Sequence, residues 1–592
     1  MMDHSAGGSS RIVTRALRGS AVILALLATS LGITAPVDAA PERTSHPAAI
    51  GDPLAQGARP TGGPHTGSRP AGRNQGYTDQ LLKRAPVPVL AWQPCGPDFP
   101  GAECAAATVP LDYDLPRRGT TEIALARIPA SDRANRVGSV LVNPGGPGAS
   151  GVALVLQGFG AFLEGQLDGR FDIVGFDPRG VAGSDPLHCF DSEDDLVAFL
   201  GDLPVFPYQR DQYRPFFERF HSLGAECLDD RQAVAANMNT ADVARDLDLL
   251  RQAVGDRKLT YLGFSYGSYL GNTYANLFPR NFRALVIDGV LDPRLWSSGW
   301  QIKSDRVATQ AEFSEFLRLC DEAGPACAFS SPGGSRARWE ALARALRAKP
   351  LVLPDGSQYT YDFLIADATG AMYAPETWGG AEGAAALLDL LADAVLGDQA
   401  AAANAAAVRR SLIDQLTRPN AEADYDNGFD AYYGNQCADT QYPSSFSAFR
   451  LIDVYAAAGS RFGPYWWWGN NGCSGWPVNR DRYVGPWTAR TSSPVLVVGN
   501  FFDGVTDHAG AEASARLLRN SRLLSYAGWG HTAYGRSVCV TEFVDTYLLT
   551  GSLPPAGTVC PANPNPFVQP ALRTAAAEQP LVGLPPSWIF RS

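Results

Sequence analysis

The stretch Leu259-Thr-Tyr-Leu-Gly-Phe-Ser-Tyr-Gly267 places a Gly-x-Ser-x-Gly motif between an apolar run and a helical stretch, Tyr266–Phe278. This order predicts a strand, a tight turn and a helix, the context in which such a motif holds a nucleophilic serine. A Cβ at Gly263 or Gly267 would collide with neighbouring backbone in this turn, while Ser265 projects outward at a helix N-terminus. We therefore predict that Ser265 is a catalytic nucleophile. The alternative is a surface serine in a glycine-rich turn.

On either side of this motif, short β-rich runs alternate with helical stretches, which is typical of a parallel sheet covered on both faces. The expected strands are Gly138–Asn143, Phe171–Phe176, Leu259–Gly263, Phe282–Asp288, Pro494–Gly499 and Ser521–Tyr526. Between residues 298 and 484 this pattern is replaced by helical and Ala-rich stretches. We therefore expect an α/β fold with a mostly parallel, doubly wound sheet and an inserted helical lid.

A serine hydroxyl needs a base to take its proton, and that base needs an acid to orient it. His531 stands in a glycine-rich loop, Gly528-Trp-Gly-His-Thr532, just beyond the last expected strand, and is the predicted base. Asp503 follows the preceding expected strand and is the predicted acid. The alternative acids are Asp507, Asp288 and Asp292. The order Ser265, Asp503, His531 is that of the α/β-hydrolase fold and excludes the chymotrypsin and subtilisin orders.

The loop Asn143-Pro-Gly-Gly-Pro-Gly-Ala-Ser-Gly151 also follows a strand, and its glycines allow backbone N–H groups to approach a substrate carbonyl closely. We predict that the N–H groups of Gly146 and Tyr266 form an oxyanion hole; a plain glycine-proline turn is the alternative. Asp177 and Arg179 follow the next strand, and we predict a structural ion pair between them.

The N-terminal segment has the features of a secretory signal. Three arginines precede an apolar run, Ala21–Ile33, whose 13 residues are too few to span a bilayer, and small residues follow up to Ala39. We expect residues 1–39 to be a signal peptide and the Gly- and Pro-rich residues 40–80 to be a disordered linker or pro-segment. The remaining expected boundaries are 81–297 and 485–560 for the two parts of the core, 298–484 for the lid and 561–592 for a C-terminal tail.

The ten cysteines agree with export, because disulfides persist in oxidising compartments. We expect five structural disulfides, and pairing of sequence neighbours is the simplest of many possible connectivities. The sequence contains no Cys-x-x-Cys and no His-Glu-x-x-His motif, so neither a metal site nor a cofactor is predicted. No stretch after the signal is long and apolar enough to span a membrane. Together these features favour a secreted, extracellular protein.

Taken together, the motifs resemble those of the secreted actinobacterial tripeptidyl aminopeptidases, α/β-hydrolase serine peptidases related to proline iminopeptidase. The likeness runs from about Trp92 to Cys560. It rests on Asn143-Pro-Gly-Gly-Pro-Gly, Gly175-Phe-Asp-Pro-Arg-Gly180, Gly263-Phe-Ser-Tyr-Gly-Ser-Tyr-Leu-Gly271, Cys437-Ala-Asp439 and Gly528-Trp-Gly-His-Thr532. The resemblance implies that Ser265, Asp503 and His531 form a catalytic triad capped by the insertion. It also implies release of short peptides from free N-termini, with tripeptides as the main product. An esterase or lipase with the same triad and a noncatalytic extracellular binding protein are the alternatives.

The charged residues of the sequence indicate which kinds of ligand the protein could bind. The net charge is −11 and no run of Lys and Arg is present, which argues against a nucleic-acid partner. The expected lid carries 22 acidic and 15 basic residues. An aminopeptidase must bind a protonated α-amine, and burying that cation without a carboxylate would be costly. Asp439 is our first candidate for this role, followed by Asp430 and Glu422; a solvated acidic surface is the alternative.

Overall fold

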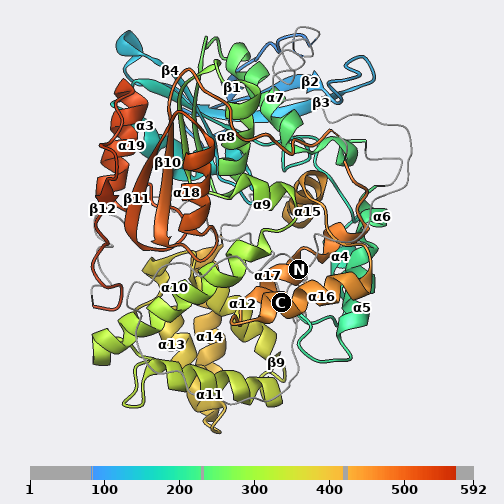
Figure 1. Ribbon diagram of the computed structural model, residues 1–592, viewed down its shortest axis with the longest axis vertical. Coiled ribbons are helices and arrows are strands. Elements are labelled where there is room, and N and C mark those ends of the chain that lie inside the picture. Colours follow the sequence, from blue (N-terminus) through green and yellow to red (C-terminus); the bar gives the residue numbers. More distant parts are fainter. Residues whose placement is uncertain (1–81, 83–84, 229–232, 418–424, 480, 569–592) are drawn as a thin grey trace, which may run out of the picture.

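The structure is a computed structural model that describes residues 82, 85–228, 233–417, 425–479 and 481–568. The expected signal peptide (1–39), the expected linker (40–80) and most of the expected C-terminal tail (561–592) lie outside the described residues. The described helices and strands form two regions, one built on a large sheet and one made of helices (Figure 1).

The central sheet is apolar on both faces, as a sheet covered on both sides requires. Its strands are β1 (Gln93–Pro94), β2 (Glu103–Pro110), β3 (Thr120–Ile128), β4 (Gly138–Asn143), β5 (Phe171–Phe176), β6 (Leu259–Phe264), β7 (Phe282–Asp288), β10 (Val495–Phe502), β11 (Ser521–Trp529) and β12 (Val559–Cys560). Their order is β1-β2-β3-β5-β4-β6-β7-β10-β11-β12. Neighbouring strands are parallel from β5 to β12, while β1, β2 and β3 pair antiparallel. The six expected strands are all present.

Alternate residues of each strand pack under different helices. In β4, Leu141 belongs to the apolar cluster of one face, whereas Val140 and Val142 belong to the cluster of the other. The first face is covered by α7 (Thr240–Ala253), α8 (Tyr266–Leu277), α9 (Pro293–Ser297) and α18 (His508–Leu517). The second is covered by α2 (Gly151–Leu154), α3 (Gly160–Gln166) and α19 (Val538–Thr550). This arrangement confirms the predicted doubly wound α/β sheet.

The helical region lies beyond the carboxyl ends of the parallel strands (Figure 1). Its helices are α4 (Glu193–Leu200), α5 (Tyr213–His221), α6 (Leu223–Cys227), α10 (Ile302–Ala323), α11 (Ser335–Ala348), α12 (Tyr361–Ala371), α13 (Ala384–Ala394), α14 (Gln399–Leu416), α15 (Gly428–Asp439), α16 (Phe446–Ala457) and α17 (Gly463–Gly469). A short hairpin, β8 (Leu351–Val352) and β9 (Gln358–Tyr359), completes it. None of the helices in the described ranges combines the length and the apolar character needed to cross a membrane.

Helices α4, α5 and α6 differ from the sequence-based expectation, which placed residues 81–297 in the sheet core. Their buried side chains belong instead to the apolar cluster of the helical region. Phe216 of α5, for example, packs edge-on against Trp468 of α17, with ring centroids 5.8 Å apart. The apolar stripe of an amphipathic helix indicates that it packs, but not against which partner.

All ten cysteines are paired, and each pair joins sequence neighbours. The bonds are Cys95–Cys104, Cys189–Cys227, Cys320–Cys327, Cys437–Cys473 and Cys539–Cys560. The five expected disulfides and their simplest connectivity are therefore confirmed. Each bond closes a loop within one region, so none of them ties the helical region to the sheet.

Asp177 and Arg179 are both structural, but the predicted ion pair between them is wrong. Arg179 is fully buried and binds Asp246 of α7 through two contacts, Nη2–Oδ1 at 2.6 Å and Nε–Oδ2 at 2.8 Å. Asp177 instead accepts hydrogen bonds from Ser150 Oγ and the Val152 N–H, which orders the start of α2. The residues lie two apart in sequence, and the chain turns each toward a different helix.

Replacing Asp246 by Ala should destabilise the protein by about 3–5 kcal/mol, because the Arg179 guanidinium would stay buried without its counter-charge. The midpoint of urea unfolding, followed by tryptophan fluorescence, measures this loss. Glu218→Ala is the control, since its partner Arg214 is as exposed as Glu218 itself, and the midpoint should not move. Equal midpoints for the two variants would contradict the prediction.

Candidate active site

Ser265 lies on the sharp turn between β6 and α8. Its backbone has φ 56°, a conformation that a residue with a Cβ rarely adopts and that marks a strained, functional turn. A Cβ on Gly263 would lie 2.5 Å from the Gly267 carbonyl oxygen, and one on Gly267 would lie 2.8 Å from the Asn143 carbonyl oxygen. Glycine is therefore required at both positions. Ser265 is largely buried, but 9% of the residue's surface remains exposed to solvent.

Asp503 and His531 meet at the carboxyl ends of β10 and β11. His531 Nδ1 lies 3.0 Å from Asp503 Oδ2 and 3.1 Å from Oδ1, and both residues are buried. Thr506 donates from its N–H to Asp503 Oδ1 at 2.8 Å and from Oγ1 to Oδ2 at 2.7 Å. Burial acts to raise the pKa of Asp503, but the charge of His531 and these hydrogen bonds outweigh it and lower that pKa below its usual value. The acid therefore stays ionised beside the imidazole.

The end of β7 connects the serine turn to the histidine loop. The Ser265 N–H donates to the Asp288 carbonyl oxygen at 2.9 Å. The carboxylate of the same aspartate accepts the N–H groups of Ala533, at 3.0 Å, and Tyr534, at 2.8 Å, just beyond His531. A Cβ on the next residue, Gly289, would lie 3.0 Å from His531 Cε1. The serine turn and the histidine loop are thus both bound by Asp288.

His531 Nε2 is the imidazole nitrogen that remains for Ser265, because Nδ1 is bound to Asp503. It is buried, and within the described part of the chain it has no hydrogen-bond partner, Ser265 Oγ included. In enzymes without substrate, catalytic hydrogen bonds are often long or poorly aligned and tighten only when substrate binds. A buried nitrogen without a hydrogen-bond partner is therefore compatible with a general base at rest.

The alternative acids have other partners. Asp507 Oδ1 accepts the Ala509 N–H and caps α18, and Asp292 Oδ1 accepts the Arg294 N–H and caps α9. Asp288 binds backbone N–H groups, and burial raises its pKa to about 6. Asp503 is the candidate that contacts the imidazole.

The predicted oxyanion loop lies directly against the serine turn. A Cβ on Gly145 would lie 2.7 Å from Ser265 Cβ and 3.0 Å from the Tyr266 nitrogen. The Gly145 N–H donates to Asn143 Oδ1, whereas the Gly146 N–H donates to no group of the described residues. The Tyr266 N–H is in the first turn of α8, where N–H groups have no partner within the helix. Neither predicted donor is thus used by another group of the described residues.

Glu312 of the helical region clamps the two loops that carry Asp503 and His531. Its Oε2 accepts the Gly504 N–H at 2.6 Å, and its Oε1 accepts the Gly530 N–H at 2.7 Å. Burial raises the pKa of Glu312 well above its usual value, and the charge of Asp503 raises it further. Sequence analysis missed this residue because nothing in the pattern of α10 indicates which of its acids faces the sheet.

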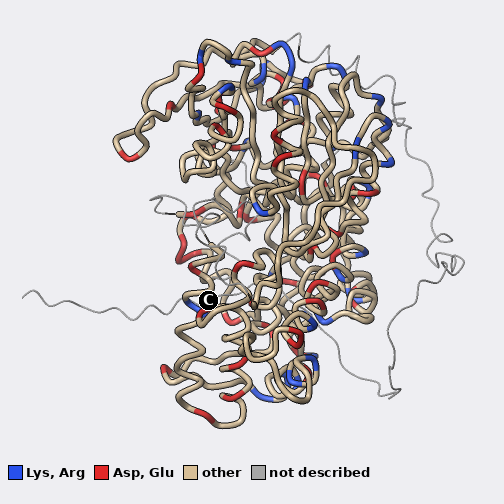
Figure 2. Tube along the Cα trace, turned by 90° about the vertical axis from the view of Figure 1, so that its left-hand side faces the viewer, with Lys and Arg blue, Asp and Glu red and all other residues tan. Residues whose placement is uncertain are grey.

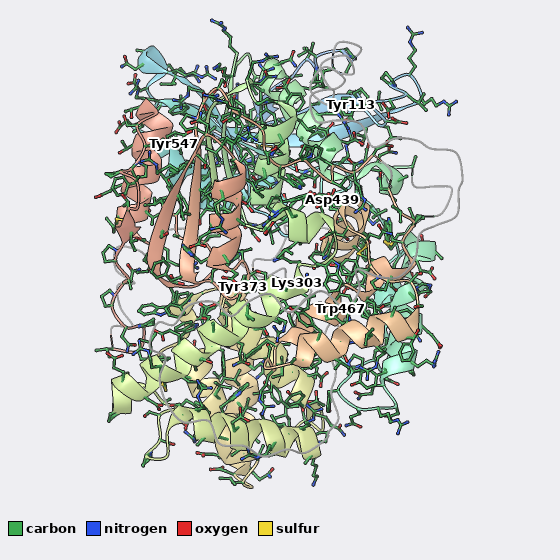
Figure 3. The ribbon with its side chains drawn as sticks, viewed as in Figure 1. Tyr113, Lys303, Tyr373, Asp439, Trp467 and Tyr547 are labelled. Atoms are coloured by element: carbon green, nitrogen blue, oxygen red, sulfur yellow. A yellow bond between two sulfur atoms is a disulfide. The ribbon has the colours of Figure 1, made fainter. Side chains whose placement is uncertain are left out.

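Two of the predicted amine-binding acids, Asp439 and Asp430, accept hydrogen bonds from other groups of the chain. Asp439 accepts the Thr240 N–H at 2.8 Å and the Thr240 hydroxyl, so it holds the start of α7; Figure 3 shows it on the α15 side of the junction. Asp430 accepts the Cys189 N–H at 3.1 Å and the Tyr425 hydroxyl at 2.7 Å. Burial raises the pKa of Asp439 and of Asp430 to about 7. Glu422 lies outside the described residues.

Among the described residues, no group of three or more His, Cys, Asp or Glu side chains has the arrangement of a metal site.

Comparison with known proteins places this site in a family. The profile described as "TAP-like protein" matches residues 458–560, and the profile described as "alpha/beta hydrolase fold" matches residues 138–320. The chain is 30% identical over 499 residues to the serine protease Hip1 of Mycobacterium tuberculosis, covering 80% of this chain and 91% of that protein. It is 31% identical over 489 residues to the tripeptidyl aminopeptidase of Streptomyces lividans, covering 81% and 87%. The chain belongs to the tripeptidyl aminopeptidase family of α/β-hydrolases.

Membership of this family makes the protein a serine hydrolase. The relatives are named for different activities, however. Carboxylesterase B of Mycobacterium tuberculosis is 32% identical over 491 residues, covering 80% of this chain and 91% of that protein. Peptidase and esterase names thus occur at equal similarity, and sequence identity alone does not separate the two substrates.

Replacing Glu312 by Gln should lower kcat about tenfold to a hundredfold with little change in KM. The glutamine side chain has one acceptor oxygen, so it can accept the N–H of Gly504 or of Gly530 but not both. The loop that loses this hydrogen bond is then less well positioned. Steady-state kinetics on an activated ester measure the effect, and near-UV circular dichroism checks the fold. Glu322→Gln, on the same helix and paired with Arg318 at the surface, should behave as wild type. Wild-type kcat in Glu312→Gln would refute the clamp.

Proposed function

We propose that this protein is a secreted serine aminopeptidase that releases short peptides from free N-termini, with tripeptides as the main product. The reaction passes through an acyl-enzyme intermediate. The observation that carries the proposal is the Asp503–His531 pair together with the strained turn of Ser265, since Asp288 binds the backbone of both loops. An aspartate-bound imidazole next to an elbow serine is the arrangement that makes a hydroxyl nucleophilic.

In the proposed mechanism, Ser265 Oγ attacks the scissile carbonyl while His531 Nε2 takes its proton. Asp503 holds Nδ1 and stabilises the imidazolium that forms. The N–H groups of Gly146 and Tyr266 stabilise the oxyanion, in a site that the helical region shields from water. His531 then gives its proton to the leaving amine, and water, activated by the same imidazole, hydrolyses the acyl-enzyme.

Export is supported by the five disulfides, which would not persist in a reducing compartment. The N-terminal pattern of arginines, apolar run and small residues supports the same assignment. Acidic residues are spread over both regions of the molecule (Figure 2), which suits a small or cationic ligand better than a polyanion.

The peptidase activity is supported by two relatives, named a tripeptidyl aminopeptidase and a serine protease. The second candidate is an esterase with the same triad, supported by the relative named carboxylesterase B. Both reactions use the same acyl-enzyme chemistry, so the distinction lies in what the helical region binds.

Ser265→Ala should lower kcat by about 10⁴–10⁶ while the protein stays folded, since triad residues act as a unit. A fluorescent diphenyl phosphonate should label the wild-type protein at Ser265, as peptide mass spectrometry would show, and should not label the variant. Ser268→Ala, three residues further along α8, is the matched control and should keep its labelling at Ser265. Near-wild-type turnover in Ser265→Ala would disprove the mechanism.

An aminopeptidase should hydrolyse Ala-Ala-Ala p-nitroanilide with a free amine far faster than the N-acetylated form. The difference should reach about a hundredfold in kcat/KM, because the acetyl group removes the cation that a carboxylate binds. p-Nitrophenyl acetate serves as the reference ester. If the ester is turned over and neither peptide is, the esterase assignment replaces the aminopeptidase one.

A further inference from the structure

Helix α10 presents one polar face toward the site, formed by Asp305, Thr309 and Glu312. These residues are spaced i, i+4 and i+7, so their side chains lie on the same side of the helix. Two of them already contact the loops of the site. Thr309 Oγ1 donates to the Gly504 carbonyl oxygen, and Glu312 accepts N–H groups from both Gly504 and Gly530. Asp305, one turn before Thr309, therefore lies at the same junction between the helical region and the sheet.

Two tyrosines show which part of the junction Asp305 faces. Tyr373 covers His531, with ring centroids 5.3 Å apart, and its carbonyl oxygen accepts the His531 N–H at 3.1 Å; Figure 3 shows Tyr373 at the boundary of the two regions. Tyr432 lies against the oxyanion loop, where a Cβ on Gly148 would be 2.8 Å from its nitrogen. Burial is the main cause of the raised pKa of both tyrosines, and the charge of Asp305 adds to each. Asp305 thus lies within electrostatic reach of both sides of the site.

The carboxyl group of Asp305 has one hydrogen-bond donor and no cation among the described residues. The residue is 5% exposed, its Oδ1 accepts one hydrogen bond, from Gln301 Nε2 at 2.8 Å, and within the described residues its Oδ2 accepts none. Among the described residues, no Arg, Lys or His forms an ion pair with it; the charge that acts on it is that of Asp507. Most other buried acids are bound by an arginine or by backbone N–H groups. These include Asp246, Asp248, Asp288, Asp367, Asp439 and Glu312.

A buried carboxyl group without a cation or a backbone donor is costly unless a ligand completes its contacts. An ammonium group supplies both the charge and the N–H donors that Asp305 lacks. We propose that Asp305 binds the protonated α-amine of the substrate and thereby restricts this site to peptides with a free N-terminus. This inference rests on the proposed function, and it replaces Asp439, Asp430 and Glu422 as the predicted amine-binding acids.

The placement of Asp305 also explains how the cleavage position would be set. The amine is held on α10, and the scissile carbonyl must reach Ser265 under the oxyanion loop. An extended chain rises about 3.3 Å per residue, so the span between the two points determines how many residues lie before the cut. Asp305 is in this sense a specificity-determining residue, and it does not touch the reacting atoms.

The test compares Asp305→Asn, which keeps the size and removes the charge, with wild type on three substrates. These are Ala-Ala-Ala p-nitroanilide, its desamino analogue, which lacks only the α-amine, and p-nitrophenyl acetate. The variant should lose about 30-fold or more in kcat/KM on the free-amine peptide, mainly through KM. The desamino peptide and the ester should change by less than about threefold, so the ratio between the two peptides should collapse.

Asp305→Glu and Asp507→Asn complete the design. The glutamate variant keeps the charge and should recover part of the preference for the free amine. Asp507 is the acid whose charge acts on Asp305, and its variant should keep the full preference. Phosphonate labelling of Ser265 confirms that each variant has an intact site.

The outcomes distinguish failure of the aminopeptidase function from failure of the proposed role of Asp305. If wild type does not prefer the free amine, the aminopeptidase function fails. If wild type prefers it and Asp305→Asn keeps that preference, only the role of Asp305 is overturned. An equal loss on all three substrates would show that Asp305 supports the fold of the site, and a loss of preference in Asp507→Asn alone would move the amine site to Asp507.

Discussion

Asp288 at the end of β7 is the residue on which the geometry of the site depends. Its carbonyl oxygen accepts the N–H of the strained Ser265, and its carboxylate accepts two N–H groups just beyond His531. One buried residue therefore holds the nucleophile turn and the base loop, which come from strands that are not neighbours in the sheet. Since a misplacement of about 1 Å can cost a hundredfold in rate, the position of this shared anchor matters for the whole site.

The helical region contributes to the site as well as covering it. Helix α10 reaches the loops after β10 and β11 through Glu312, whose two oxygens each take one backbone N–H. No disulfide joins the two regions among the described residues, so this contact depends on noncovalent interactions such as these hydrogen bonds. The arrangement of the triad therefore depends on the position of the helical region. The face of α10 that contacts the two loops also carries Asp305.

Hydrogen-bond partners, more than burial, separate the acids with a structural role from the one that we propose binds a ligand. Asp439 and Asp430 looked suited to bind a cation because they lie in a stretch without basic residues. In the folded chain both are buried and already accept hydrogen bonds from groups far away in sequence, Thr240 and Cys189. Asp305 lies in a stretch with basic neighbours, yet its carboxyl group receives one side-chain hydrogen bond and no ion pair. Local charge is thus a poor guide to the charge that a site presents.

The sequence by itself determined the order of the strands along the chain, the disulfide-rich character and the turn of Ser265, because these depend on residues close together in the chain. The glycines at 263 and 267, for instance, are required by backbone atoms within the same turn or the adjacent loop. Only the tertiary structure decided that α4–α6 join the helical region, that Arg179 binds Asp246, and that Glu312 and Asp305 face the site. These contacts join residues tens to hundreds of positions apart, and they depend on how amphipathic helices choose their packing partners, which no local pattern encodes.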